Sequence, residues 1–441
     1  MKRKVLHIGF VALALFLCLC LSIGMAITGP SQAGANEKLS EFPKLRTEDE
    51  GLNPGFLTQF SDWVDDRFFL RQELISVDHW ISGKLFRTSG DSDVILGENG
   101  WLYYADTLAD YTGTEPMSER DLFSAAKNLS LMSDYCREND RKFLFVIAPN
   151  KNSLYDENMP DFGCKAKKTD AERLLERLNS LNVDTVDLFS AFGLENEVLY
   201  FAHDSHWNTK GAALGADLIN ASFNLESNYY KSDFSQTTPH SGDLYQMVYP
   251  AFDDAEKDYI CGRELDYSFT SSATKPDAIV LSTESDGQGS LLAYRDSFGN
   301  LLFPYLADTF ETAKFSRSAT YDLTGEAEYV LIELVERNLD YLIKNLPVIP
   351  APEAEVTLPE KPKAAITVSA TERGGLLQVK GQLTETDDDS EIYVVCGNTA
   401  YEAFCLADGG FGAYLDITCV PEYVMCRQGG APVMYEIQIQ E

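Results

Sequence analysis

Basic residues are scarce in this sequence. Its 441 residues include 36 Lys and Arg against 69 Asp and Glu, so the formal net charge is −33. A protein that binds nucleic acid needs a positive patch to neutralise phosphates, and no basic stripe occurs here. The composition therefore excludes nucleic acid as a partner and makes polyanions in general poor ligands.

Paired metal-ligand cysteines are also missing. No Cys-x-x-Cys occurs among the nine cysteines, so a structural zinc site has no support. Seven of the cysteines lie outside the first 28 residues. Because an odd number cannot pair completely, at least one of these thiols is free or bonded elsewhere, and the disulfide pairing stays open.

Core-forming residues, by contrast, are plentiful. Hydrophobic residues make up 44% of the chain and aromatic residues 12%, which excludes wholesale disorder. The length is too great for one compact domain and fits two or three. Boundaries between domains are expected where the composition of the chain changes.

The N-terminal segment is basic and then apolar. Lys2, Arg3 and Lys4 precede residues 5–27, which are almost wholly apolar. About 20 apolar residues cross a bilayer as a helix, and basic flanks stay in the cytoplasm. We therefore predict a signal-anchor helix over residues 1–28, a juxtamembrane linker over residues 29–55, and a single-pass protein of the cell membrane whose bulk is extracytoplasmic. Small residues after the apolar run leave cleavage and secretion as the alternative.

The C-terminal part changes composition twice. Residues 347–365 are rich in proline, which predicts a stiff, extended linker. Residues 366–441 contain runs that alternate apolar and polar positions and are separated by Gly-rich turns. That pattern predicts a small all-β, sandwich-like domain, interpreted as a spacer or interaction module.

Residues 56–346 alternate helix and strand patterns. Capping signals at Ser118 and Thr169 precede helical periodicity, and further helical runs start near Thr209 and Asn300. Apolar runs between them predict strands, at residues 143–147, 183–188, 198–201, 291–294 and 329–334. This alternation is typical of an α/β fold with an open parallel sheet and helices on both faces, in which ligands bind beyond the carboxyl ends of the strands.

Two of the predicted strands end in polar turns that precede helices. Asp204 and His206 follow residues 198–201, and Ser297 follows residues 291–294. A serine becomes a nucleophile when a histidine takes its proton and a carboxylate orients that histidine. We therefore predict Ser297 as nucleophile, His206 as general base and Asp204 as the orienting group.

Two other histidines lie close to this pattern. His203 suggests a metal cluster with Asp204 and His206, but no further ligand occurs at suitable spacing, so this alternative ranks lower. His79 lies in the string Asp78-His79-Trp80, which partly repeats the motif. That string falls in a helical, amphipathic region and is interpreted as structural.

Several strings occur in the order found in one family. They are residues 66–71 (Asp-Arg-Phe-Phe-Leu-Arg), 97–103 (Gly-Glu-Asn-Gly-Trp-Leu-Tyr), 149–151 (Pro-Asn-Lys), 204–207 (Asp-Ser-His-Trp), 296–300 (Asp-Ser-Phe-Gly-Asn) and 336–337 (Glu-Arg). With them the chain resembles the SGNH-hydrolase-like domain of alginate O-acetyltransferases of the AlgJ/AlgX type and the related DHHW proteins. The resemblance covers residues 56–346, the predicted catalytic domain.

The resemblance implies a fold and a reaction. It implies an SGNH-hydrolase-like, flavodoxin-like fold and the same triad of Ser297, His206 and Asp204. It also implies that an acetyl group passes through Ser297 to a hydroxyl of a cell-envelope or exported polysaccharide, with a membrane-bound O-acyltransferase partner as acetyl donor and no metal or nucleotide cofactor. The acidic composition favours a neutral or zwitterionic acceptor over a uronic-acid polymer.

Three residues near the turns are further candidates. Asn150, after a buried strand, is expected to supply an oxyanion donor, with a turn-forming role as the alternative. Lys151 and Arg295 are candidates for binding a polymer carboxylate, with pairing to local acids as the alternative. Two alternative functions stay open: a carbohydrate acetyl-esterase with the same triad, and a non-catalytic scaffold that binds polysaccharide or a synthase.

Overall fold

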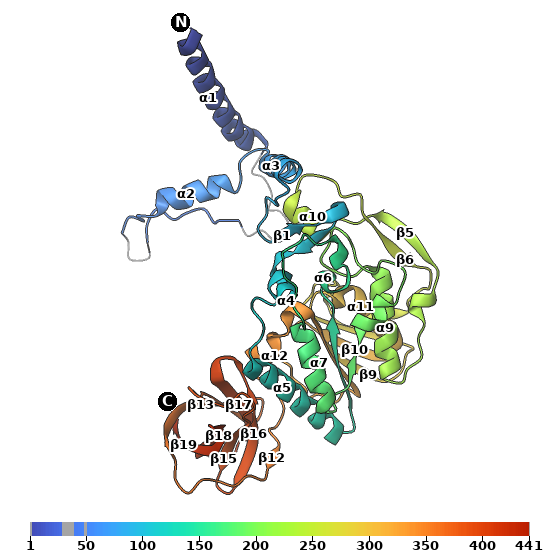
Figure 1. The fold of residues 1–441 in the computed structure, drawn as a ribbon, viewed down its shortest axis with the longest axis vertical. Coiled ribbons are helices and arrows are strands. Elements are labelled where there is room, and N and C mark those ends of the chain that lie inside the picture. Colours follow the sequence, from blue (N-terminus) through green and yellow to red (C-terminus); the bar gives the residue numbers. More distant parts are fainter. Residues whose placement is uncertain (1, 29–38, 48–50, 441) are drawn as a thin grey trace.

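The computed structural model describes residues 2–28, 39–47 and 51–440. Figure 1 shows an α/β body, a separate C-terminal β domain beneath it, and N-terminal helices that project from the top of the α/β body. Of the predicted linker over residues 29–55, residues 39–47 and 51–55 are described, and the rest lies outside the described residues.

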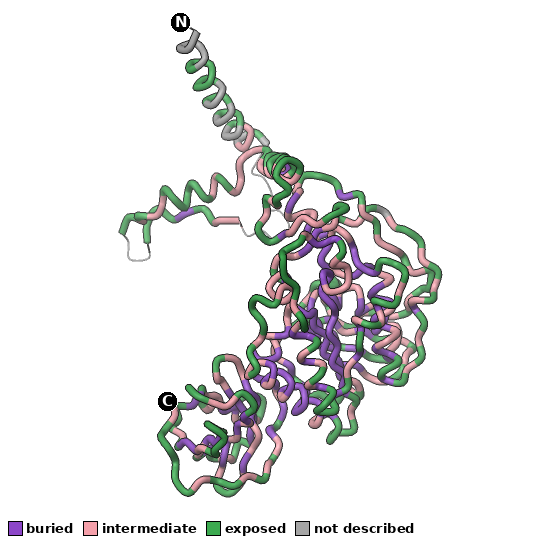
Figure 2. The backbone as a smooth tube through the Cα atoms, viewed as in Figure 1, coloured by how far each residue is buried: buried purple, intermediate pink, exposed green. Residues whose placement is uncertain are grey.

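Three helices precede the α/β body. They are α1 (Lys2–Thr28), α2 (Phe56–Asp65) and α3 (Arg71–Phe86). The helix α1 lies where the sequence predicts one. Within the part of the chain that the structure describes, however, no helix combines the length and the apolarity needed to cross a membrane. The helix α2 has no buried residue and projects away from the body (Figures 1 and 2), although the predicted boundary at residue 56 assigns it to the catalytic domain.

A seven-stranded sheet forms the centre of the α/β body, in the order β4-β3-β11-β9-β10-β8-β7. Its strands are β3 (Lys142–Ala148), β4 (Thr185–Val186), β7 (Tyr267–Phe269), β8 (Val280–Ser285), β9 (Ser290–Tyr294), β10 (Thr312–Ser316) and β11 (Tyr329–Val335). The neighbours from β4 to β10 are parallel, whereas β8 and β7 extend the sheet antiparallel. The predicted parallel sheet is therefore confirmed, and the antiparallel edge is an addition to it.

Helices cover both faces of this sheet. One layer consists of α5 (Glu119–Glu138), α7 (Asp170–Ser180) and α12 (Tyr341–Lys344), and the other of α8 (Leu188–Gly193), α9 (Thr209–Ser222) and α11 (Gly299–Thr309). In β3, Phe143 and Phe145 face the first layer, and Leu144 and Val146 face the second. Burial on both faces explains why β3 is continuously apolar, and Figure 2 shows the sheet as the buried centre of the body.

The helix starts follow the predicted caps. The Ser118 side chain accepts a hydrogen bond from the Asp121 N–H at the start of α5. Thr169 and Glu172 form the predicted capping box at the start of α7. Each cap satisfies N–H groups that a helix leaves unpaired in its first turn, so these local signals fix where the helices begin.

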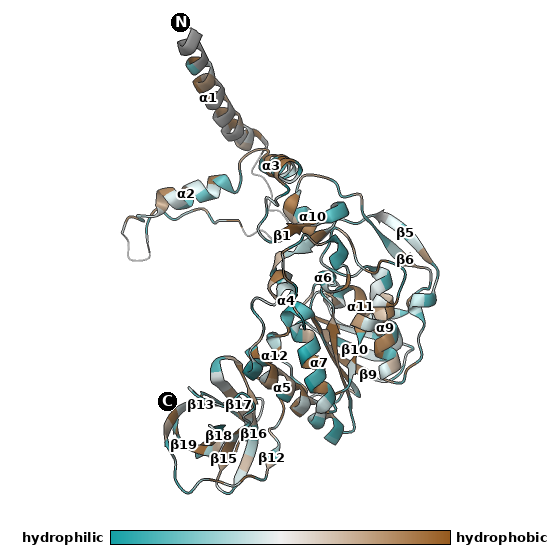
Figure 3. Ribbon diagram, viewed as in Figure 1, coloured by the Kyte–Doolittle hydropathy of each residue, from teal (hydrophilic) through white to brown (hydrophobic). Residues whose placement is uncertain are grey.

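Shorter elements complete the body. They are β1 (Val94–Leu96), β2 (Leu102–Tyr104), α4 (Leu108–Thr112), α6 (Lys151–Leu154), β5 (Phe234–Pro239), α10 (Asp243–Val248) and β6 (Lys257–Cys261). The strands β1 and β2 form one antiparallel hairpin, and β5 and β6 form another antiparallel pair. Hydrophobic residues gather around β1 and α10 in Figure 3, where Val94, Leu102, Leu244 and Val248 form a small core of their own.

The prediction of a strand at residues 198–201 is wrong. This segment makes a single isolated bridge, between Tyr200 and Trp207, and does not join the central sheet. Its apolar side chains pack into the core instead, with Leu199 and Tyr200 almost fully buried against the layer of α8, α9 and α11. Core burial, not strand pairing, accounts for the apolar run.

The C-terminal domain is a sheet that closes on itself, not the predicted sandwich. Its eight strands are β12 (Glu353–Ala354), β13 (Ala364–Arg373), β14 (Leu376–Gln382), β15 (Ile392–Cys396), β16 (Thr399–Cys405), β17 (Gly410–Asp416), β18 (Tyr423–Gln428) and β19 (Ala431–Ile439). The sheet closes because β16 pairs with β17 as well as with β15. The proline-rich segment is also not only a spacer, since β12 lies within it and pairs with β16.

The helix α5 holds the C-terminal domain against the α/β body. The buried Asn128 side chain donates to the carbonyl oxygens of Leu342 (3.0 Å) and Cys405 (2.8 Å), and its Oδ1 accepts from Cys405 N (3.0 Å). The preceding residue, Lys127, pairs with Glu402 at 2.6 Å. Buried polar groups need such partners, so this contact has one favoured geometry.

Candidate active site

Ser297 lies on the turn between β9 and α11. The turn is fixed by Asp296, whose Oδ1 accepts from Phe298 N (2.9 Å) and whose Oδ2 accepts from Val335 N (2.7 Å) and Asn338 Nδ2 (3.0 Å). The turn therefore connects the end of β9 to the end of β11, its neighbour in the sheet. Ser297 is half-buried at the carboxyl edge of the parallel strands, where ligands of such sheets bind.

Ser297, His206 and Asp204 form a continuous hydrogen-bonded chain. Ser297 Oγ lies 2.8 Å from His206 Nε2, and His206 Nδ1 lies 2.7 Å from Asp204 Oδ1. Asp204 Oδ1 also accepts from the backbone N–H of His206 at 3.0 Å. The structure thus brings the three predicted triad residues together in the order that serine activation requires.

Asp204 lies between two histidines. Its Oδ2 is 3.1 Å from His240 Nε2 and accepts from Asp243 N at 3.0 Å. Burial disfavours the carboxylate, but the hydrogen bonds from His206 and His240 outweigh it and hold the pKa of Asp204 well below its usual range. Asp204 therefore stays ionised and can orient His206 at neutral pH.

The acids around His206 favour its charged form. Burial lowers the pKa of His206, but the hydrogen bond and charge of Asp204 and the charge of Asp243 outweigh burial, so its pKa is raised above the usual value. Asp243 Oδ2 lies 3.5 Å from His206 Nδ1 and accepts from Ser205 Oγ at 2.6 Å. An imidazolium formed by proton transfer from Ser297 would be stabilised in this setting.

His240 and Asp243 are not among the site residues that the sequence predicts. Both lie beyond the antiparallel strand β5, in a stretch that the sequence does not assign to the α/β alternation, and both approach Asp204 from about 40 residues downstream. Nothing in the local sequence indicates that approach. The scarcity of histidine, five in the chain, is the one feature that draws attention to His240.

Lys151 holds the loop that carries Asp204 and His206 and does not face a substrate. Its Nζ is buried and donates to the carbonyl oxygens of Phe201 (3.1 Å), Ala202 (3.0 Å) and Asp204 (2.6 Å). Burial lowers the pKa of Lys151 to about 8. All three donors of the ammonium group are used within the protein, so binding of a polymer carboxylate, which we considered from the sequence, is not supported.

Arg295 is likewise engaged inside the protein. It is 5% exposed, and its guanidinium donates to Asn300 Oδ1 (2.6 Å), Pro276 O (2.6 Å) and Asp296 O (3.2 Å). Burial lowers the pKa of Arg295 to about 10. Arg295 therefore fixes the Ser297 turn to its surroundings. It also lines the cavity beside Ser297, and its role as a substrate contact stays a prediction.

Asn150 combines a fixed backbone with an unpaired side chain. It is fully buried at the start of α6, and its N–H donates to Glu336 Oε2 at 2.9 Å. Neither atom of its side-chain amide has a hydrogen-bond partner among the described residues. A buried amide without partners is costly and needs an explanation, such as a catalytic role or a bound water.

A cavity of about 860 Å³ lies beside Ser297 and His206, and we call it the triad cavity. Its charged lining residues are Asp93, Asp106, Asp243, Asp296, Arg295, Arg317 and Arg337. Arg337 is half-exposed, and its guanidinium lies 5.5 Å from the Phe298 ring and 5.3 Å from the Tyr104 ring. Within the described residues it has no ion-pair partner, so it is free to meet a ligand. Arg337 lies two residues after the end of β11, and the same search of strand ends that found Ser297 would have found it.

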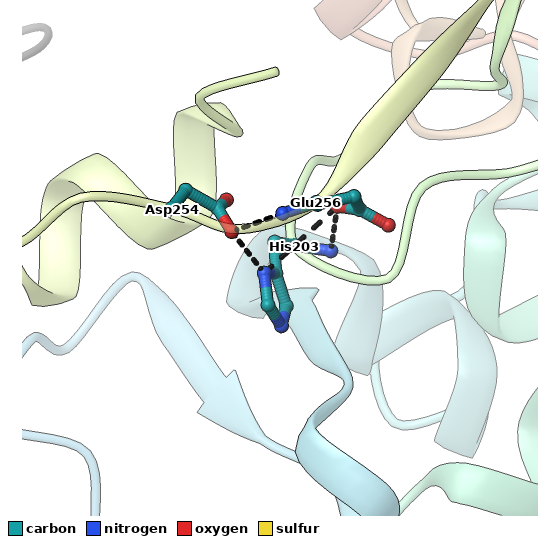
Figure 4. Close-up of side chains that lie close together, drawn as sticks. All are labelled: His203, Asp254 and Glu256. Carbon is teal, nitrogen blue, oxygen red and sulfur yellow. Dashed lines mark hydrogen bonds and ion pairs between the residues drawn. The ribbon is translucent and has the colours of Figure 1, made fainter. Parts of the chain in front are cut away.

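Among the described residues, two groups of side chains have the composition of metal sites. They are Asp204, His206 and Asp243, and, on the other side of the loop, His203, Asp254 and Glu256 (Figure 4). In the second group His203 Nδ1 lies 2.7 Å from Asp254 Oδ1, and each oxygen of Glu256 accepts a backbone N–H, from Ala202 (2.6 Å) or His203 (2.8 Å). Hydrogen bonds inside the protein already satisfy His203 Nδ1 and both carboxylates, so the geometry of this group does not require an ion.

The comparisons with known proteins agree with the predicted resemblance. Residues 94–263 match the family described as SGNH hydrolase-like domain, acetyltransferase AlgX, which confirms the resemblance over that range. The matched range includes Asp204 and His206 and ends before Ser297. No curated protein sequence matches the chain.

Three solved structures illustrate the similarity. Bacillus cereus PatB1 is 18% identical over 56% of this chain and 98% of its own, with a TM-score of 0.43. A DHHW family protein from Eubacterium siraeum is 16% identical over 49% of this chain and 85% of its own, with a TM-score of 0.40. The O-acetyltransferase domain of Pseudomonas putida AlgJ is 16% identical over 56% of this chain and 91% of its own, with a TM-score of 0.38.

Proposed function

We propose that this protein is an O-acetyltransferase that passes an acetyl group through Ser297 to a hydroxyl of a cell-envelope or exported polysaccharide. The observation that carries the proposal is the 2.8 Å contact between Ser297 Oγ and His206 Nε2, beside a cavity and backed by Asp204. The match of residues 94–263 to an acetyltransferase domain supports acetyl as the group transferred.

The first half of the reaction forms an acetyl-serine. Ser297 Oγ attacks the acetyl carbonyl while His206 Nε2 takes the hydroxyl proton, and Asp204 holds the resulting imidazolium through Nδ1–H. The tetrahedral oxyanion needs donors, and we propose the unpaired Asn150 side-chain amide and the backbone N–H of Ser297 for this role. Collapse breaks the bond to the leaving group, which takes the proton from His206.

The second half transfers the acetyl group. An acceptor hydroxyl gives its proton to His206 Nε2 as its oxygen attacks the acetyl-serine carbonyl, and the ester bond to Ser297 breaks as Oγ regains that proton. Transfer needs a hydroxyl held in the triad cavity in preference to water. The free guanidinium of Arg337 supports the binding of a polar group there.

The setting of the reaction follows from the sequence. A basic start followed by the apolar residues 5–27 supports export, and we propose that the enzyme works outside the cytoplasm, as an anchored or a secreted protein. A membrane-bound O-acyltransferase is the proposed acetyl donor.

Turnover of a chromogenic acetyl ester tests the nucleophile. We expect Ser297→Ala to lower kcat by a factor of about 10³ or more, since no other group replaces the attacking oxygen. Ser222→Ala, an exposed serine on the far end of α9, is the matched control and should keep the wild-type rate. Equal rates in wild type and Ser297→Ala would contradict the triad and leave only a binding role.

Product analysis separates transfer from hydrolysis. With the same ester as donor and an oligosaccharide as acceptor, a transferase yields acetylated sugar, and a carbohydrate acetyl-esterase yields only acetate. We expect the mass of the sugar to rise by one acetyl group in the wild type and not in Ser297→Ala. Acetate release without any sugar product would favour the esterase.

A further inference from the structure

A second cavity lies beside the triad cavity and plays no part in the triad. It has a volume of about 520 Å³, and we call it the aromatic cavity. Its lining includes five aromatic rings and one imidazole, from Trp80, Trp101, Tyr245, Tyr249, Phe252 and His203. Such a concentration of rings around one cavity is unusual on a surface that otherwise carries many acids.

The helix α10 separates the two cavities. Its residues Asp243, Leu244 and Met247 line the triad cavity, whereas Tyr245 and, just past the end of the helix, Tyr249 line the aromatic cavity. The strand β2 also lies between the cavities, since Tyr104 lines the triad cavity and Leu102 lines the aromatic cavity. A ligand in the aromatic cavity is therefore one helix away from the reacting serine.

The catalytic loop is bonded tightly to this wall. Tyr245 N donates to the carbonyl oxygen of His203 at 3.0 Å, and Leu102 N donates to that of Ala202 at 2.9 Å. A Cβ on Gly242 would lie 2.3 Å from the same His203 oxygen, so glycine is needed for this close approach. One loop thus carries His203 into the aromatic cavity and His206 to Ser297.

The rings present faces that a flat, apolar surface can cover. The His203 ring stacks on Tyr245 at 5.1 Å, and Tyr249 stacks on Phe252 at 6.0 Å. Trp80, on α3, is 50% exposed. The sequence suggests that the string Asp78-His79-Trp80 is structural, and His79 fits that view, since its Nδ1 lies 2.8 Å from Val248 O. The exposed indole of Trp80 has no such partner in the described structure.

His203 offers a hydrogen-bond acceptor to the cavity. Its Nδ1 lies 2.7 Å from Asp254 Oδ1, and the Asp254 side chain is completely buried. Because the carboxylate only accepts, Nδ1 carries the proton and Nε2 keeps its lone pair in the neutral ring. Figure 4 shows the far edge of the ring turned away from Asp254 and Glu256. Nε2 has no hydrogen-bond partner among the residues described.

We propose that the aromatic cavity binds one sugar ring of a neutral glycan, as a subsite for the acceptor. The proposal rests on the proposed transferase function and names where the acceptor is held. The C–H face of a pyranose is apolar and packs on aromatic rings, while its edge hydroxyls need hydrogen-bond partners. Trp80 and Tyr249 supply rings, His203 Nε2 accepts from a hydroxyl, and Glu98 and Lys84 offer further polar contacts.

Charge favours a neutral sugar over a uronic acid. Lys84 and Arg87 line the cavity, but Glu98 lines it as well, and Asp254 and Glu256 lie directly behind His203. These acids offset the two cations. A sugar carboxylate would therefore gain little net attraction here.

Calorimetric titration of the full chain with neutral hexasaccharides tests the subsite. Cellohexaose, chitohexaose and maltohexaose serve as probes, and the titrations use the Ser297→Ala background. The nucleophile is absent there, so the binding result does not depend on whether the proposed reaction is correct. We expect at least one probe to bind, with about tenfold weaker affinity in Trp80→Ala and in His203→Phe, and with partial recovery in Trp80→Phe.

Phe86→Ala provides the matched control. Phe86 lies on α3 like Trp80 and is 69% exposed, but it does not line the cavity, so its loss should leave sugar affinity unchanged. Thermal unfolding of each variant separates lost binding from lost folding. The proposal is overturned if no neutral hexamer binds, if a hexauronate binds more tightly, if EDTA abolishes binding, or if well-folded Trp80→Ala and His203→Phe bind like the wild type.

Discussion

The acid limb of the pH–rate profile gives a direct test of the charges around His206. His206 acts as a base only when neutral, so activity rises with pH through its pKa. Burial opposes the charged ring, but Asp204 and then Asp243 raise the pKa of His206 above its ordinary value of 6.5. Replacing Asp243 by Asn removes one of these negative charges. The imidazolium is then less favoured, the pKa of His206 falls, and the acid limb moves to lower pH.

The separation of the charges sets the size of the shift. At 3.5 Å between Asp243 Oδ2 and His206 Nδ1, two unit charges interact by about 5 kcal/mol at an effective dielectric constant of about 20. The Asp243 side chain is 30% exposed, so solvent screens this interaction. Burial and the Asp204 charge also raise the pKa of Asp243, which reduces its mean charge. We therefore expect a shift of about one pH unit, or about 1.4 kcal/mol.

The assay is kcat/KM for a chromogenic acetyl ester across the pH range where His206 titrates. Asp243→Asn should move the midpoint of the ascending limb down by about one unit, and the maximal rate need not match the wild type. Asp134→Asn, on the surface of α5 and paired with Arg137, is the charge-matched control and should leave the midpoint in place. A midpoint that stays constant or rises in Asp243→Asn would refute the electrostatic reasoning.

Three further substitutions test the parts that hold the site. Lys151→Met removes three hydrogen bonds to the loop of Asp204 and should lower both the melting temperature and kcat, measured by calorimetry and ester turnover. Asn128→Leu leaves buried backbone groups at the α5 interface without partners, and urea unfolding should show a loss of about 3 kcal/mol. Burial raises the pKa of Glu336 to about 8, so the folded state holds a proton that the unfolded chain releases above its ordinary pKa. Stability therefore falls as pH rises towards 8, by up to about 1.4 kcal/mol per unit, and Glu336→Gln should flatten that fall in unfolding curves taken at several pH values.

The strand ends account for what the sequence predicts well. Buried parallel strands are continuously apolar, so β3, β9 and β11 stand out, and the polar turn after β9 marks Ser297. His206 and Asp204 are found with it because they are two residues apart and their roles are chemically paired. Each of these signals lies within a few consecutive residues, so it can be read from the sequence without knowledge of the fold.

Contacts between distant segments account for what the sequence does not predict. Residues 198–201 have the apolarity of a strand, but their burial comes from core packing. The C-terminal sheet closes through the β16–β17 pair, and alternation along each strand is the same in a sandwich and in a closed sheet. Lys151 and Arg295 have the charge of substrate ligands, and only the fold shows that carbonyl oxygens occupy them.

Lys151 and Arg295 form hydrogen bonds inside the protein, and this changes what the net charge implies for the charge of the acceptor. The formal charge of −33 discourages an anionic acceptor, and the sequence leaves Lys151 and Arg295 as a possible local exception. Both donate hydrogen bonds to the protein's own oxygens, which weakens the case for that exception. Arg295, Arg317 and Arg337 line the triad cavity, but Asp93, Asp106, Asp243 and Asp296 line it too. With acids opposing cations in both cavities, neither offers a uronic-acid polymer the excess of positive charge it would need against the acidic surface. The local charges therefore support the same proposal as the net charge: the acceptor is a neutral glycan, held through its hydroxyl groups and ring faces and not through carboxylates.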